Sequence, residues 1–465
     1  MSAVESARPD DEPVGLLALP PMRAVLRLAM PTTFVMLLAT ATNVLYTYFV
    51  SQLGAEAIAA VSLVFPIALL VGTAMQGGLG GGAASGVARA LGAGRHREAT
   101  DIAEHAIALA VAAGLAVGLF MVLGGTGVFR LMGGTGAVVD AAATFGRVVF
   151  GGAVVTFTGA MFDSVLRGEG NVRVPSIWSS VSLGLQIILT PLCMFWLHLG
   201  LVGAGVALIV SQAIATAARA RFVFGGGGVV RPAPWPRRIR RRPLAEILRV
   251  GVPASLSTVT NYLGLMVLTS VIARLGTVHL AAYGLCTRFD FLLMSFAYGF
   301  AAAVLTLVGL ATGARRPERA RIYVVRAGVC IVGLLSVPAA VLYWRSDLWM
   351  GLFSADPELH AVGAAYFRLV GPSYPFVAVS MVLAFAFQGL GRATIPLVWM
   401  VIRVVAVLGV SIWCTQVLGL GERAVFTTVA VANVLSAIVM IALFVVTERR
   451  FVAGRVTAAA ALAHR

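Results

Sequence analysis

Long runs of apolar residues with few charges recur along the whole chain, and they limit what it can fold into. Only 12% of its 465 residues are charged, about half of the roughly 25% that is usual in soluble domains. Twelve runs reach the roughly 17–25 apolar residues that a helix needs to cross a bilayer. They lie approximately at 28–50, 57–86, 102–124, 138–166, 174–197, 201–224, 250–273, 278–311, 322–344, 361–388, 395–418 and 424–447. The sequence therefore predicts an all-α polytopic membrane protein with twelve transmembrane helices.

The basic residues indicate how these helices are oriented. All 35 are arginines, and the formal net charge is +16. Most lie in the amino-terminal tail and in the even-numbered connections, so the positive-inside rule places both termini in the cytoplasm. They are not interleaved with aromatic residues as in a nucleic-acid-binding surface. We expect a bacterial cytoplasmic membrane protein whose partners are a small-molecule substrate and the lipid bilayer, with no nucleic acid and no obligate protein partner.

The polar segments divide the chain into five parts. We predict a cytoplasmic tail over 1–22, a first lobe over 23–224 and a linker over 225–243. A second lobe follows over 244–450, and a cytoplasmic tail over 451–465. The linker reads GGGGVVRPAPWPRRIRRRP, and its glycines and prolines predict a flexible, non-helical segment.

The two lobes resemble each other in sequence. Four features recur at an offset near 221 residues: LRLAMP and LRVGVP, LGAGRHREA and TGARRPERA, RGEGNVRVP and QGLGRATIP, and the arginines Arg147 and Arg368. Six helices per lobe give the two repeats the same orientation in the membrane. A parallel repeat of this kind is typical of transporters that bind their substrate near the bilayer midplane.

Several segments resemble the MATE (multidrug and toxic compound extrusion) family, in the group of NorM- and DinF-like exporters. They are LAMP followed by FVSQLGAEAIAAVSL, then GVARALGAGRHREA, LRGEGNVRVP, and AAYGLCTRFDFL with TGARRPERA. The resemblance spans nearly the whole chain. It implies two six-helix lobes, alternating access, and export coupled to inward flow of protons or sodium ions, without another cofactor.

Polar side chains within the spans are the candidate ligands for substrate or ion. Neutral groups on several helices are expected to line a cavity of aromatic and amide groups suited to amphipathic cations. With one acid they form the predicted set: Asn43, Tyr46, Gln186, Thr190, Asn261, Tyr262 and Asp290. Asp290 is either a titratable group or the partner of a nearby arginine. Asp163 lies four residues before Arg167, which predicts an ion pair on one helical face. Neither a catalytic set nor the Cys and His spacing of a metal site is present, so an enzyme is not expected.

The sequence departs from the family where the coupling ion is expected to bind. The resemblance implies an acid where Tyr46 stands, polar and acidic residues at Gln186 and Thr190, and in some members an acid at Asn261. Three explanations follow. Coupling has moved to Asp290 or Asp163, or the protein is a weakly coupled or uncoupled exporter, or it carries a different substrate such as an anionic or zwitterionic metabolite. We favour Asp290.

Two other functions compete with multidrug efflux. One is a flippase of a lipid-linked precursor, which related exporters in the broader group imply. A flippase of this kind is expected to have a strongly basic cavity inside the membrane, whereas most arginines of this chain lie in loops. The other is a relative that no longer transports and acts as a membrane sensor or partner, which the missing carboxylates favour.

Overall fold

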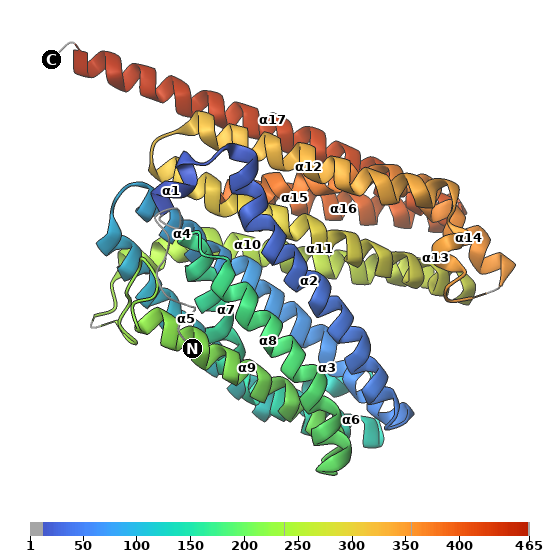
Figure 1. The fold of residues 1–465 in the computed structure, drawn as a ribbon. Helices are drawn as coiled ribbons and strands as arrows, with labels where there is room; N and C mark the ends of the chain where they lie inside the picture. Colours follow the sequence, from blue (N-terminus) through green and yellow to red (C-terminus); the bar gives the residue numbers. More distant parts are fainter. Residues whose placement is uncertain (1–12, 237, 355, 464–465) are drawn as a thin grey trace. The chain divides into compact units, whose positions relative to one another are not determined.

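The computed structural model describes residues 13–236, 238–354 and 356–463 and forms helices over most of them (Figure 1). In this part of the chain, eleven helical segments are long and apolar enough to cross a membrane. A bent pair, α6 (Gly136–Gly151) and α7 (Ala153–Gly168), makes a twelfth if it counts as one span, and its two helices meet at 43°. This pair covers the predicted span 138–166. The all-α polytopic fold is therefore confirmed. Residues 1–12 and 464–465 of the predicted tails lie outside the described residues.

The chain separates into two compact units. Of the described residues, unit 1 contains 13–18 and 34–258, and unit 2 contains 19–33 and 259–463. The first part of α2 thus belongs to unit 2, although the rest of that helix belongs to unit 1. The first part of α10 belongs to unit 1 in the same way. The lobes predicted from the sequence were divided at the linker. They therefore placed the start of α2 in the first lobe and the start of α10 in the second, whereas each of these helix starts belongs to the other unit.

Unit 1 is built around α5, which packs along both α6 and α7, and around the pair α8 and α9 (Figure 1). Its helices are α1 (Pro13–Ala18), α2 (Pro21–Ser51) from Phe34 onward, α3 (Ala55–Thr73), the π-helix η2 (Ala74–Leu79), α4 (Gly80–Gly92), α5 (His96–Leu131), α6, α7, α8 (Arg173–Pro191), the π-helix η3 (Leu192–Trp196), α9 (Gly200–Phe224) and α10 (Arg241–Ala273) as far as Thr258.

Unit 2 is built around α11 and α15, which pack against each other and against α12. Besides the remaining parts of α2 and α10, its helices are α11 (Thr277–Gly313), α12 (Pro317–Trp344), α13 (Asp347–Met350), α14 (Pro357–Leu369), the 3₁₀ helix η4 (Gly371–Ser373), α15 (Tyr374–Gly389), α16 (Thr394–Gln416) and α17 (Glu422–Ala463).

The first parts of α10 and α2 pack closely against matching glycines in the two repeats. A Cβ atom at Gly78 of η2 would lie 2.7 Å from the Cα atom of Ser255 on α10. A Cβ atom at Gly299 of α11 would lie 3.0 Å from the backbone nitrogen of Thr33 on α2. Small residues allow transmembrane backbones to approach this closely. The sequence repeat therefore corresponds to a repeated packing contact within each unit.

The linker between α9 and α10 is not free, contrary to the flexibility predicted from its glycines and prolines. The carboxylate of Glu169, just after α7, accepts the backbone N–H groups of Val229 and Val230 at 3.0 and 3.2 Å. Glu104 on α5 accepts the backbone N–H of Ala233 at 2.9 Å. Arg240 donates its backbone N–H to His105 Nε2 at 2.8 Å. These bonds fix the linker along one end of unit 1.

Attachment of the linker is expected to weaken as pH rises. Burial raises the pKa of the Glu169 carboxyl from 4.5 to about 7, although the two backbone bonds oppose the shift. A group with a raised pKa contributes stability below its unperturbed pKa and loses that contribution as pH rises through the shifted one. A spin label on Val229→Cys, in a variant without the four native cysteines, is expected to become more mobile between pH 5 and 8.

Glu169→Gln is the control for this prediction, because it removes the titration and leaves His105 and Glu104 in place. The label in this variant is expected to keep one mobility across the range. An unchanged pH profile after the substitution would assign the effect to another group.

Candidate functional site

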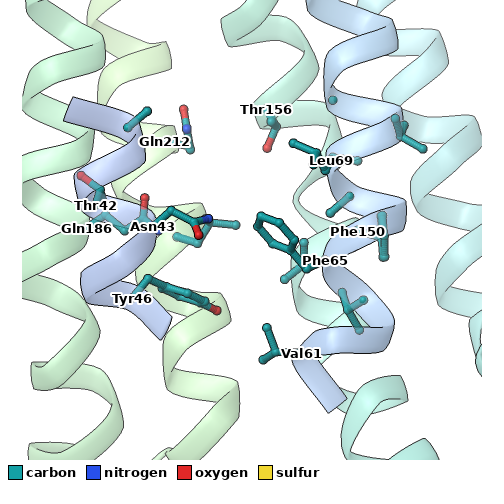
Figure 2. A pocket seen from close by; sticks show the side chains of 18 of the residues that line it. Thr42, Asn43, Tyr46, Val61, Phe65, Leu69, Phe150, Thr156, Gln186 and Gln212 are labelled. Carbon is teal, nitrogen blue, oxygen red and sulfur yellow. The ribbon is translucent and has the colours of Figure 1, made fainter. Parts of the chain in front are cut away.

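Unit 1 contains a cavity of about 280 Å³. Figure 2 shows Thr42, Asn43 and Tyr46 of α2 on one side of it and Val61, Phe65 and Leu69 of α3 on the other. Further lining residues come from α6, α7, α8 and α9: Phe145, Val149, Phe150, Ala153, Thr156, Phe157, Leu183, Gln186, Leu208 and Gln212. Of the described residues that line it, none carries an Asp, Glu, Arg, Lys or His side chain.

The cavity combines aromatic rings with a few neutral polar groups. Tyr46 and Gln186 are largely buried, whereas the side chain of Asn43 is exposed. Thr42 is occupied locally, because its hydroxyl donates to the carbonyl of Leu38 at 2.8 Å. Aromatic faces attract organic cations, and amide groups supply donors and acceptors. The cavity can therefore hold a small amphipathic molecule without a fixed charge of its own.

The structure brings only part of the predicted set together. Asn43, Tyr46 and Gln186 line the cavity. Thr190 does not: it is 1% exposed, and its hydroxyl donates to the carbonyl of Gln186 one turn earlier at 2.6 Å. The other three, Asn261, Tyr262 and Asp290, belong to unit 2.

Asp290 is held by two tyrosines of unit 2. Tyr366 of α14 donates its hydroxyl to Oδ2 at 2.5 Å, and Tyr374 of α15 donates to Oδ1 at 2.6 Å. Both tyrosines are almost fully buried, at 3% and 2% exposure. Among the contacts of the described residues, no arginine pairs with Asp290, and its neighbour Arg288 is exposed. A carboxylate bonded only to neutral hydroxyls keeps its charge uncompensated, which suits a group that exchanges a proton or attracts a cation.

The spacing predicts Arg167 as the partner of Asp163, but the ion pair found for Asp163 is with Arg219. Asp163 Oδ1 lies 2.7 Å from Nε of Arg219, which comes from α9, and the two side chains are 7% and 3% exposed. Arg219 also donates from Nη2 to Ser179 Oγ on α8 at 2.7 Å. The buried pair thus joins three helices, and Asp163 is neutralised within unit 1.

Sequence reasoning also missed Arg403, a basic residue in the middle of α16. Its Nη2 donates to Asn433 Oδ1 at 2.6 Å. A signal was available, because an arginine within an apolar span is costly and marks a functional position by default. The tyrosines around Asp290 gave no such signal, since they lie more than 70 residues away.

Two segments of this chain, residues 31–192 and 253–413, match the MatE family model. Together they cover more than half of the sequence. The chain belongs to the MatE family. It is consequently a multi-pass membrane transporter and not an enzyme. The two matched segments also correspond to the two sequence repeats, one starting in each copy of the LRLAMP-like motif.

Several known transport proteins are similar to this chain along most of its length. A FAD transporter of Shewanella oneidensis is 23% identical over 84% of this chain and 87% of its own. The multidrug export protein MepA of Staphylococcus aureus is 23% identical over 81% and 82%. A solved MOP superfamily transporter of Pyrococcus furiosus, described as having a binding pocket of reversed polarity, is 26% identical. It has a TM-score of 0.89 over 96% of this chain and 99% of that one.

Proposed function

We propose that this MatE family member exports small amphipathic or cationic compounds by alternating access, in exchange for protons or sodium ions. The observation that carries the proposal is the uncharged cavity of unit 1 with its aromatic and amide lining. The similarity to proteins named for multidrug resistance or export, NorM of Thermotoga maritima and MepA, supports it. The arginine distribution supports an orientation with both termini in the cytoplasm.

Asp290 is the group that we assign to coupling. The positions where the family resemblance implies acids are neutral in unit 1, and the remaining acid deep in that unit, Asp163, is paired with Arg219. Asp290 also lies deep within a membrane helix, but in the described part of the chain its carboxylate has no cationic partner and is bonded by two tyrosine hydroxyls. Protonation adds an O–H donor to one carboxyl oxygen, so the hydrogen bonds between Asp290 and the two tyrosine hydroxyls differ between its charged and neutral states. Such a two-state element is what coupling requires.

Efflux from proteoliposomes tests the proposal. A fluorescent lipophilic cation is loaded, and a proton gradient and a sodium gradient are imposed separately. Acceleration by one inward gradient is the expected result. Coupled export would be contradicted if the protein binds the dye but the efflux rate is the same with a proton gradient, with a sodium gradient and with no gradient.

Removing the aromatic lining is expected to weaken substrate binding. Phe65→Ala removes a ring that points into the cavity, and a cation–π contact is worth about 0.5–2 kcal/mol. The affinity of purified protein for tetraphenylphosphonium, measured by calorimetry, should fall about three- to thirtyfold. Phe195→Ala, an exposed phenylalanine of η3 outside the cavity, is the matched control and should keep the affinity. Equal losses in both variants would rule out this cavity as the binding site.

A further inference from the structure

Arg403 places a positive charge deep within unit 2. It lies nine residues after Thr394, where α16 begins, so about 14 Å along the helix at 1.5 Å per residue. The hydrocarbon core of a bilayer is roughly 30 Å thick, which puts the guanidinium close to the middle of the span.

The contacts of Arg403 leave its charge uncompensated. Nη2 donates to Asn433 Oδ1 on α17, and Asn433 in turn donates from Nδ2 to Ser373 Oγ at 2.9 Å. Asn433 and Ser373 are buried and neutral. Among the described residues, the ion pairs include none with Arg403. The buried arginine of unit 1, Arg219, differs in this respect, because Asp163 neutralises it.

Two donors on the same face of α16 have no acceptor. Nε of Arg403 and Nε1 of Trp399 are both shielded from solvent, and neither has a hydrogen-bond partner in the described structure. Residues four apart lie one turn from each other on a helix. Both groups can only donate, so each needs an acceptor to offset its burial. Two orphan donors beside an uncompensated charge match the chemistry of an anion.

We propose that Trp399 and Arg403 form an anion-binding site in unit 2 that receives a carboxylate or phosphate group of the transported molecule. Arg403 supplies the charge, Trp399 supplies a second donor, and Asn433 with Ser373 holds the guanidinium in place. The substrate class then extends to amphipathic zwitterions and anions. This assignment rests on the proposed transport function and deepens it, because it names a chemical group that the uncharged cavity of unit 1 cannot select.

Equilibrium binding of two matched dyes tests the site without any gradient. Rhodamine B carries a free carboxylate, and its ethyl ester has the same ring system without that charge. We measure fluorescence polarisation with the full-length protein in phosphatidylcholine nanodiscs. Arg403→Gln is expected to weaken rhodamine B about tenfold or more, the usual range for a charge-assisted bond, and to leave the ester unchanged. Trp399→Phe keeps an aromatic ring but removes the indole N–H donor, and it is expected to weaken rhodamine B binding severalfold.

Three results would overturn the assignment. Equal losses of affinity for both dyes would show that Arg403 has a structural role. Unchanged affinity for rhodamine B would show that the donors of Arg403 and Trp399 bind ordered water and not the substrate. Loss of the effect in phosphatidylglycerol nanodiscs would assign the site to a lipid phosphate. If gradient-driven efflux fails while the dye selectivity persists, the coupling proposal falls and the anion site stands. If Arg403→Gln does not fold, the Trp399→Phe variant, checked for monodispersity, still tests the site through its affinity for the two dyes.

Discussion

Gradient-driven efflux falls at least about tenfold when Asp290 is replaced by Asn, which corresponds to about 1.4 kcal/mol or more in the barrier. The amide has nearly the same shape as the carboxyl group, and its oxygen can still accept a hydroxyl from Tyr366 or Tyr374. It cannot take up or release a proton near neutral pH. The substitution therefore removes the charge change and keeps the packing. Efflux rates from proteoliposomes under the effective gradient measure the loss.

The control for this substitution is Asp140→Asn, since Asp140 is exposed near the start of α6. It removes one carboxylate from the protein and should keep the efflux rate. Binding of tetraphenylphosphonium to the Asp290→Asn protein should also persist, because the cavity of unit 1 is intact. Wild-type efflux from this variant would exclude Asp290 from coupling.

The second large effect is on stability. Replacing Asp163 by Asn leaves the buried guanidinium of Arg219 without its counter-charge, and removing one partner of a buried ion pair costs about 3–5 kcal/mol. The pair joins α7 to α9, and Arg219 continues to Ser179 on α8. We therefore expect a clear decrease in the melting temperature of the purified protein, measured by thermal unfolding in detergent. Arg219→Gln should destabilise the protein to a similar extent.

The Arg167→Gln variant distinguishes the two possible partners of Asp163, Arg219 and Arg167. Arg167 lies four residues after Asp163, whereas the ion pair at 2.7 Å is the one that Asp163 forms with Arg219. Its loss should lower the melting temperature by less than half as much as the loss of Arg219. A larger effect of Arg167→Gln would restore the local pair as the main partner.

The sequence was sufficient for features that depend on local composition. Apolar runs predict transmembrane helices because the bilayer requires every backbone group to bond within its own segment. The repeat could be found because matching glycines recur at the tight turns: Gly170 and Gly391 both adopt positive φ, at 86° and 76°. Glycine tolerates this conformation without steric cost, so the motif is visible in both halves.

Features that depend on contacts between distant segments could not be predicted. The partner of Asp163 is 56 positions away in sequence, and spacing along one helix gives no information about a neighbouring helix. The linker illustrates the same limit. Its glycines and prolines correctly exclude a helix, but its attachment depends on carboxylates at Glu169 and Glu104 that lie in other segments. Composition predicts which backbone conformations are available and not which partners hold them.

Proton release on substrate binding tests the central claim that Asp290 couples transport. If substrate and proton exclude each other, binding of one must displace the other by thermodynamic linkage. Tetraphenylphosphonium, which cannot titrate, is added to purified protein in weakly buffered solution containing a pH-sensitive dye. We expect proton release by the wild-type protein and none by the Asp290→Asn variant. Equal release from both proteins, or binding to the wild type without release, would contradict it.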